Sequence, residues 1–165
     1  MRGPPTVLVV CPSHRDRREL VTIAEADGLR LCFHDYASIE LEEMVAPTPR
    51  LVAPASVHDE IERIVSTAVA AGVDAVVSTD DYPGSTLAAI VAHRLGLAGT
   101  PASADLLCQH KYHSRLIQRR VRPDATPPFA LLEPGIVPEL AFPFFIKPVK
   151  SFFSVGAFQV DDVHA

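Results

Sequence analysis

The sequence predicts an α/β fold with a doubly wound parallel sheet, and three features carry this prediction. Val7–Val10 and Ala75–Val77 are short aliphatic runs, which is typical of parallel strands buried on both faces. Between them, apolar residues recur at helical spacing, at Ile61, Ile64, Val65, Ala68 and Val69. Strand-like and helix-like segments alternate along this part of the chain, as they do when helices cover both faces of a parallel sheet.

The first elements are defined by the residues that end them. The first strand stops at Cys11–Ser13, and the helix that follows ends at Gly28, because glycine readily adopts the left-handed conformation of a helix C-terminus. Leu29–Phe33 is predicted to be the second strand, and Ile39–Met44 a short helix. Ala46–Pro54 contains three prolines, so we expect an irregular connection there.

Two further helices have recognisable starts and ends. Ser56 and Asp59 have the spacing of a capping box, with Asp in the usual place of Glu, and Gly72 closes that helix. Ser85 is predicted to cap the next helix, which ends at Gly96. The two helices flank a predicted strand and so continue the alternating order.

The loop Ser78–Gly84 follows a predicted strand directly. Ligands bind outside the carboxyl ends of the strands in open parallel sheets. Asp80, Asp81 and Tyr82 are therefore candidates to contact a substrate. The alternative is loop chemistry alone, since Asp, Pro and Gly favour turns without any ligand.

The alternation of strand-like and helix-like segments stops after Gly99. Helices are predicted at Ala104–Gln109 and Ser114–Arg120, and a strand at Phe129–Leu132. His110 and His113 are three residues apart and could share a helix face as metal ligands. No third ligand accompanies them, so the metal alternative is the weaker one.

A hairpin is predicted near the end of the chain. Phe144–Ile146 reads as a strand that Lys147 closes, and Val155–Val160 reads as the returning strand. Backbone N–H groups, hydroxyls and a lysine in such a turn could hold a phosphate chain. The candidate turn residues are Ser151, Ser154 and Gly156. The alternative is an ordinary β-hairpin with surface lysines.

Composition argues against several classes of protein. The chain has 15 Lys+Arg and 20 Asp+Glu, a net charge of −5, which argues against nucleic-acid binding. Three widely spaced cysteines indicate reduced thiols, and neither a signal peptide nor an apolar membrane span is recognisable. We therefore expect a cytoplasmic protein without membrane partners. Neither GxxxxGK[ST] nor GxGxxG occurs, so a P-loop or dinucleotide fingerprint is missing.

The order of three segments resembles the front of an ATP-grasp enzyme. They are RLGLAGTPASADLLCQHKYHSRLIQ (94–118), PPFALLEP (127–134) and FPFFIKPVKSFFSVGA (142–157). The resemblance covers residues 75–160 well and residues 1–75 only at the level of the fold. It implies a Rossmann-like pre-ATP-grasp domain at 1–102, and an incomplete α+β ATP-grasp N-terminal subdomain at 103–165.

The resemblance also implies roles for individual residues. Lys111 matches a lysine that contacts ATP phosphate, and Lys147 matches the strand lysine at the α-phosphate and the adenine edge. Ser151–Gly156 matches the loop over the β- and γ-phosphates, although Phe152 and Phe153 depart from its usual richness in glycine. The family uses ATP and Mg²⁺, and the Mg²⁺ ligands are expected outside this chain.

The function that follows is the N-terminal part of an ATP-dependent carboxylate–amine or carboxylate–thiol ligase that acts through an acyl phosphate. Its partners would be a small-molecule carboxylate and a nucleophile. We expect the chain to be inactive by itself, because it lacks the Mg²⁺-binding half. The alternative is a non-catalytic α/β module that binds a small ligand or a protein, with pairing into a homodimer through the uncovered hairpin.

Overall fold

The computed structural model describes residues 3–35, 56–136, 138–151 and 154–162. The predicted helix at 39–44 and the connection at 46–54 lie outside these residues. Contacts divide the chain into two units, Met1–Asp105 and Leu106–Ala165, and the division falls within helix α5 (Ala102–Gln109). Each unit is described by itself below.

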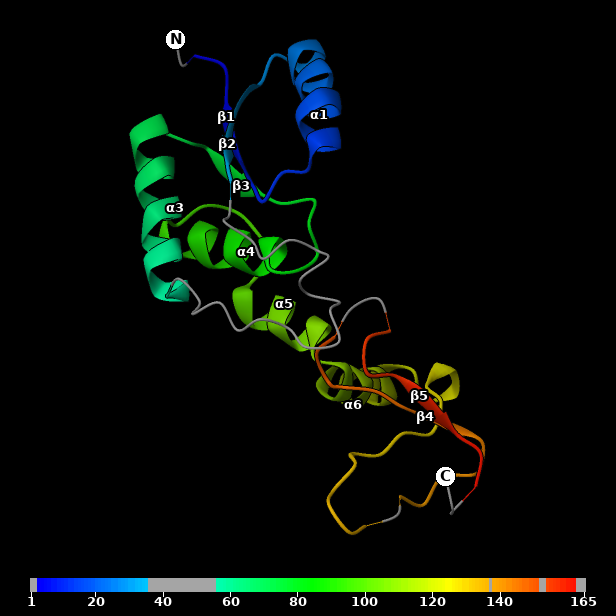
Figure 1. Cartoon of the computed structure of the whole chain (residues 1–165). Helices are drawn as coiled ribbons and strands as arrows, with labels where there is room; N and C mark the ends of the chain where they lie inside the picture. The colour runs from blue at the N-terminus through cyan, green and yellow to red at the C-terminus, as the bar shows by residue number, and fades with distance from the viewer. Residues whose placement is uncertain (1–2, 36–55, 137, 152–153, 163–165) are drawn as a thin grey trace. The chain divides into compact units, whose positions relative to one another are not determined.

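The first unit is built on a parallel three-stranded sheet in the order β2-β1-β3 (Figure 1). The strands are β1 (Thr6–Val10), β2 (Arg30–His34) and β3 (Ala75–Val77). In the register, Leu8 of β1 lies opposite Cys32 and Val76. All three predicted strands are confirmed to within one residue at either end.

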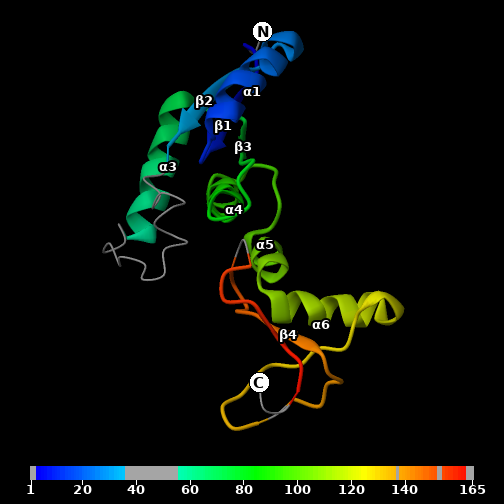
Figure 2. The same cartoon turned by 45° about the vertical axis from the view of Figure 1, so that its right-hand side comes forward.

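Helices cover both faces of this sheet. Helix α1 (His14–Asp27) and helix α3 (Val57–Ala71) lie on opposite sides of the strands in both views (Figures 1 and 2). Helix α4 (Gly84–Arg94) packs against β1, β3 and α3, so it lies on the α3 side. This arrangement confirms the predicted doubly wound α/β fold.

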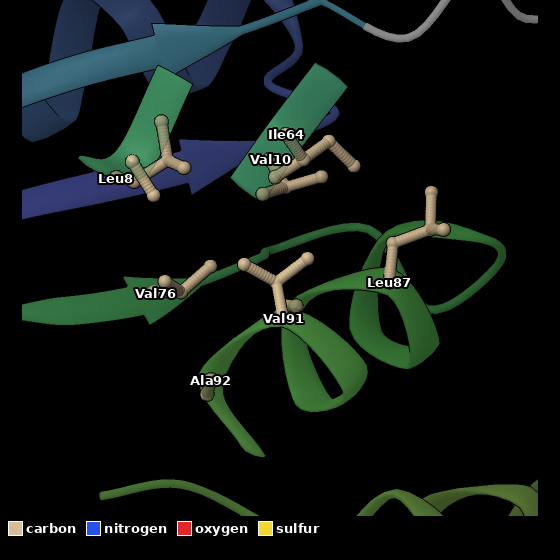
Figure 3. Close-up of a cluster of buried hydrophobic side chains, with 9 residues drawn as sticks. Leu8, Val10, Ile64, Val76, Leu87, Val91 and Ala92 are labelled. Atoms are coloured by element: carbon tan, nitrogen blue, oxygen red, sulfur yellow. The ribbon is translucent and has the colours of Figure 1, made fainter. Parts of the chain in front are cut away.

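The core fills the space between the sheet and the helices α3 and α4. Side chains from β1, β3 and both helices converge there (Figure 3). They include Leu8, Val10, Ile64, Val76, Leu87 and Val91. Val9 is also buried, and it faces the opposite side of the sheet from Leu8 and Val10, because side chains alternate along a strand. Strand β1 is therefore covered on both faces, as its continuous aliphatic run predicted.

A buried carboxylate lies beside the core. Glu60 of α3 is only 1% exposed, hydrogen-bonds to Nε2 of His34 at 2.9 Å, and forms an ion pair with Arg63. Nδ1 of His34 lies 3.3 Å from the hydroxyl of Thr67. These partners compensate the cost of removing the charge of Glu60 from water.

Most helix ends follow their predicted signals. Gly28 and Gly72 adopt positive φ angles of 66° and 60° at the ends of α1 and α3. Ser56 accepts the backbone N–H of Asp59 at 3.4 Å and so caps α3, but the Asp59 side chain makes no return bond to Ser56, so the capping box predicted there is only half formed. The prediction for Ser85 was wrong, because α4 begins at Gly84 with the Gly84 N–H donating to the Asp80 carboxylate.

The second unit contains helix α6 (Lys111–Val121), a short 3₁₀ helix η1 (Pro123–Ala125) and an antiparallel hairpin. The hairpin pairs β4 (Phe144–Ile146) with β5 (Phe158–Val160), with Phe145 opposite Gln159. Helix α6 begins three residues earlier than predicted, because His110 serves as its N-cap. Strand β5 is shorter than predicted, because a turn occupies the residues before it.

The strand predicted at Phe129–Leu132 was wrong. These residues form no ladder, and an isolated bridge between Glu133 and Ile136 follows them. Prolines flank the segment on both sides, and Phe129 packs on α6 instead. The guanidinium of Arg119 lies 3.9 Å from the centre of its ring, and Tyr112 meets it edge-on at 5.7 Å. Apolar residues alone predicted a strand, but without a partner strand they pack on a helix.

Among the described residues, no helix combines the length and apolar character that crossing a bilayer requires.

Candidate functional site

The second unit brings together three of the predicted phosphate-binding residues. Lys111 is the first residue of α6, Lys147 directly follows β4, and Ser151 lies four residues further along. The ammonium of Lys111 donates to the carbonyl oxygen of Ser151 at 2.8 Å and to its hydroxyl at 3.3 Å. The backbone N–H of Lys111 donates to the carbonyl of Val149 at 2.9 Å. Residues about forty positions apart are thus held side by side.

The electrostatics of this cluster favour an anion. The pKa of Lys111 is lowered, first because burial disfavours its charged form and then because the charge of Lys147 repels it. Within the described parts of the chain, neither lysine forms an ion pair with a carboxylate. A bound anion would stabilise both ammonium groups.

The turn before β5 has a left-handed backbone. Ser154 and Gly156 have φ angles of 57° and 69°, and the N–H of Ala157 donates to the Ser154 carbonyl at 3.0 Å. A Cβ at Gly156 would lie 3.0 Å from Cγ of Pro148, so both the conformation and the close approach favour glycine. Across the described residues, no hydrogen bond joins Ser154 or Gly156 to either lysine. Their predicted contact with phosphate stays a prediction.

Asp80, Asp81 and Tyr82 lie in the first unit, at the carboxyl end of β3. In the sheet, β2 lies on one side of β1 and β3 lies on the other, so the direction of strand order reverses at β1. The region outside the carboxyl ends of β1 and β3 is therefore a topological switch point. Tyr82 is half exposed there. The predicted substrate residues therefore lie where open α/β sheets bind ligands.

Asp80 also has a structural role, as the loop-chemistry alternative anticipated. Its carboxylate accepts the N–H of Gly84 at 2.7 Å and so caps α4. Burial raises the pKa of Asp80, and the negative charges of Asp81 and Asp16 raise it further.

The sequence reasoning missed three residues at this same edge. Ser13 and Asp16 form a full capping box at the start of α1, in which the Ser13 N–H donates to the Asp16 carboxylate at 2.7 Å. Their spacing is the signal that could have revealed them. Cys11 has a positive φ angle, and burial, followed by the charges of nearby carboxylates, raises the pKa of its thiol to about 12.

His110 and His113, the residues of the weaker metal alternative, lie at the start of α6. Nδ1 of His110 accepts the backbone N–H of His113 at 3.3 Å, so it already has a partner. No group of three or more His, Cys, Asp or Glu side chains with metal-site geometry occurs in the described ranges.

A shallow hollow of 490 Å³ lies between α6 and η1. It is lined by Ile117, Gln118, Val121, Arg122, Ala125 and Thr126. None of the predicted site residues lines it, and no sequence motif indicated it.

No family model matches the sequence, and no curated protein matches it either. Among solved structures, an L-amino acid ligase from Bacillus licheniformis superposes with a TM-score of 0.67 at 20% sequence identity. The match covers 99% of this chain and 41% of that protein, so the chain spans less than half the length of its structural neighbour. A likeness at this identity shows the fold and nothing further. The chain thus shares its fold with part of that ligase, in line with the fold that the order of its three segments led us to expect.

Proposed function

We propose that the chain is the N-terminal, nucleotide-binding region of an ATP-dependent ligase, in which Lys111, Lys147 and Ser151 hold the phosphates of ATP. The main support is that Lys111 and Lys147, from separate segments, lie near enough for their charges to interact, while neither forms an ion pair with a carboxylate in the described part of the chain. The fold of an L-amino acid ligase is consistent with this proposal. A cluster that holds two cations together suits a polyphosphate better than a neutral ligand.

The side chains suit phosphate in their chemistry. Lysine supplies a compact charge with three donors, and a serine hydroxyl donates one more hydrogen bond. The carbonyl and hydroxyl oxygens of Ser151 accept hydrogen bonds from the Lys111 ammonium. Phosphate oxygens of ATP would replace them as acceptors. Ser154 and Gly156 would extend the cradle from the turn before β5. ATP would supply the phosphoryl group that activates a carboxylate as an acyl phosphate, and Mg²⁺ would be held by residues outside this chain.

Within the same proposal, the edge beyond β1 and β3 would hold part of the substrate. Asp81 and Asp16 make this edge acidic, so it suits the ammonium of an amine nucleophile better than a carboxylate. Asp81→Ala should weaken binding of an amino acid at least fivefold, on the order of 1 kcal/mol for an exposed charge pair. Asp80→Asn is the matched control, because its amide oxygen can still cap α4. Equal affinity in Asp81→Ala and the parent chain would remove the substrate role of this loop.

The phosphate role is tested by calorimetry with ATP·Mg²⁺. We expect the parent chain to bind, and Lys147→Ala and Lys111→Ala each to lose about 10- to 100-fold in affinity, the usual range for a hydrogen bond to a charged group. Lys150→Ala is the matched control, since it removes a neighbouring lysine that the proposal does not use. The proposal is wrong if the parent fails to bind, or if Lys150→Ala weakens binding as much as Lys147→Ala.

A further inference from the structure

His110 closes the N-terminus of α6 through an imidazole nitrogen. Its Nδ1 atom accepts the backbone N–H of His113 at 3.3 Å, where a Ser, Thr, Asp or Asn oxygen usually accepts. The two imidazole rings lie 4.2 Å apart between centroids. Because Nδ1 accepts this hydrogen bond, the neutral ring carries its proton on Nε2. The cap therefore depends on the protonation state of one side chain.

We propose that His110 is a proton-sensitive cap, which orders the first turn of α6 while Nδ1 is unprotonated and loosens that turn when Nδ1 takes up a proton. Two effects act in the same direction. A protonated Nδ1 has no lone pair to accept the His113 N–H. A positive charge at the N-terminus of a helix also opposes the helix macrodipole.

The sign of the pH dependence follows from proton counting. The ordered turn requires a neutral imidazole at His110, so the loosened turn binds more protons. Its population therefore rises as the pH falls. Histidine is the side chain whose charge ordinarily changes between pH 5 and 8, which makes this range the one to examine.

The charged groups around the turn do not offset this effect. Lys111 follows His110 on the helix, and Lys147 on the segment after β4 is close enough for its charge to lower the pKa of Lys111. On α5, the carboxylate of Asp105 accepts the hydroxyl of Thr86 at 2.6 Å. Among the residues that the structure describes, no carboxylate is hydrogen-bonded to either imidazole. A proton on His110 thus joins a cluster of cations.

The consequence for binding runs through Lys111. Its backbone N–H and its ammonium are both anchored to the segment after β4, at Val149 and Ser151. Loosening the turn displaces the ammonium and weakens its contact with an anion, which opposes the added attraction of the protonated ring. This consequence rests on the proposed function, whereas the cap itself does not.

The test uses the full ¹⁵N-labelled chain without nucleotide. Hydrogen exchange followed by NMR gives the protection factor of the His113 amide between pH 5 and 8, after correction for the intrinsic exchange rate. We expect protection to fall about fivefold from pH 8 to pH 5, the change that corresponds to losing a typical helix cap. Unchanged protection over this range overturns the proposal.

Two variants isolate the imidazole of His110. His110→Asn keeps a side-chain oxygen as acceptor but does not titrate, so protection should stay high and independent of pH. His113→Asn is the matched control, because it removes the neighbouring ring and keeps the backbone N–H, so the pH dependence should remain. The reverse pattern in the two variants overturns the proposal. A chain that shows the cap effect without binding ATP overturns only the proposed function.

Discussion

Gly84 offers a sharp test of how the loop after β3 is built. A Cβ placed on Gly84 would overlap the hydroxyl of Ser78 and lie 2.9 Å from both Cβ and Oδ2 of Asp80. The Ser78 hydroxyl cannot move freely, because it donates to the carbonyl of Val10 at 2.7 Å and accepts the N–H of Asp80 at 3.1 Å. Gly84→Ala must therefore disturb the contact between β1, β3 and the start of α4.

The expected loss of stability can be estimated from these contacts. Inserting a methyl group into a tightly packed site costs about 1–3 kcal/mol. Loss of the hydrogen bond by which Asp80 caps α4 costs about 1 kcal/mol more. Replacing glycine restricts the unfolded chain, which offsets about 0.4–1 kcal/mol. The net free energy of unfolding should fall by about 2 kcal/mol, within the range of these terms.

Urea denaturation followed by far-ultraviolet circular dichroism measures this change. With urea slopes of about 1–3 kcal/mol per molar, the midpoint should fall by about 1 M. Gly3→Ala is the matched control, because nothing lies within 4 Å of a Cβ at that position. Adding Ser78→Ala to Gly84→Ala should recover part of the loss, since it removes the overlapping oxygen. A Gly84→Ala chain as stable as the Gly3→Ala control would refute this account.

Two further stability measurements test local contacts. Ser13→Ala should lower stability by about 1 kcal/mol, because Ser13 caps α1. Its hydrogen bond to Asp16 is the largest cause of the lowered pKa of that carboxyl. Asp16 therefore stabilises the fold above its ordinary pKa of 3.8, and this contribution disappears as the pH falls through the lowered value. Urea unfolding between pH 2 and 7 should show a weaker acid dependence in Ser13→Ala, and equal acid dependence in both chains would contradict the assignment. Glu60→Ala should cost about 3 kcal/mol, because it leaves the partly buried His34 and the half-exposed Arg63 without their shared partner, while Glu60→Gln should cost less. Equal losses in the two Glu60 variants would contradict this expectation, since both remove the charge and only Gln can keep the hydrogen bonds.

The candidate site was predictable in part. Lys111 and Lys147 were identified from their order in the chain, and their proximity emerged only in the folded structure. The link from Lys111 to Ser151 joins residues forty positions apart, and no local pattern encodes such a contact. The sequence left the role of Asp80 open between loop chemistry and ligand contact, because an Asp in a turn has the same appearance whether it caps a helix or contacts a ligand.

Local signals determined the secondary structure of the first unit. Aliphatic runs, the helical stripe at Ile61–Val69 and glycines such as Gly28 and Gly72 act within a few residues of themselves, so the sequence alone predicted these elements and their parallel arrangement. Where such local signals were ambiguous, tertiary contacts determined the conformation of the segment. Phe129–Leu132 had the composition of a strand, yet packing of Phe129 on α6 took the place of strand pairing. Strand pairing and side-chain convergence depend on partners far away in sequence, and the free energy of those contacts is defined only in the folded chain.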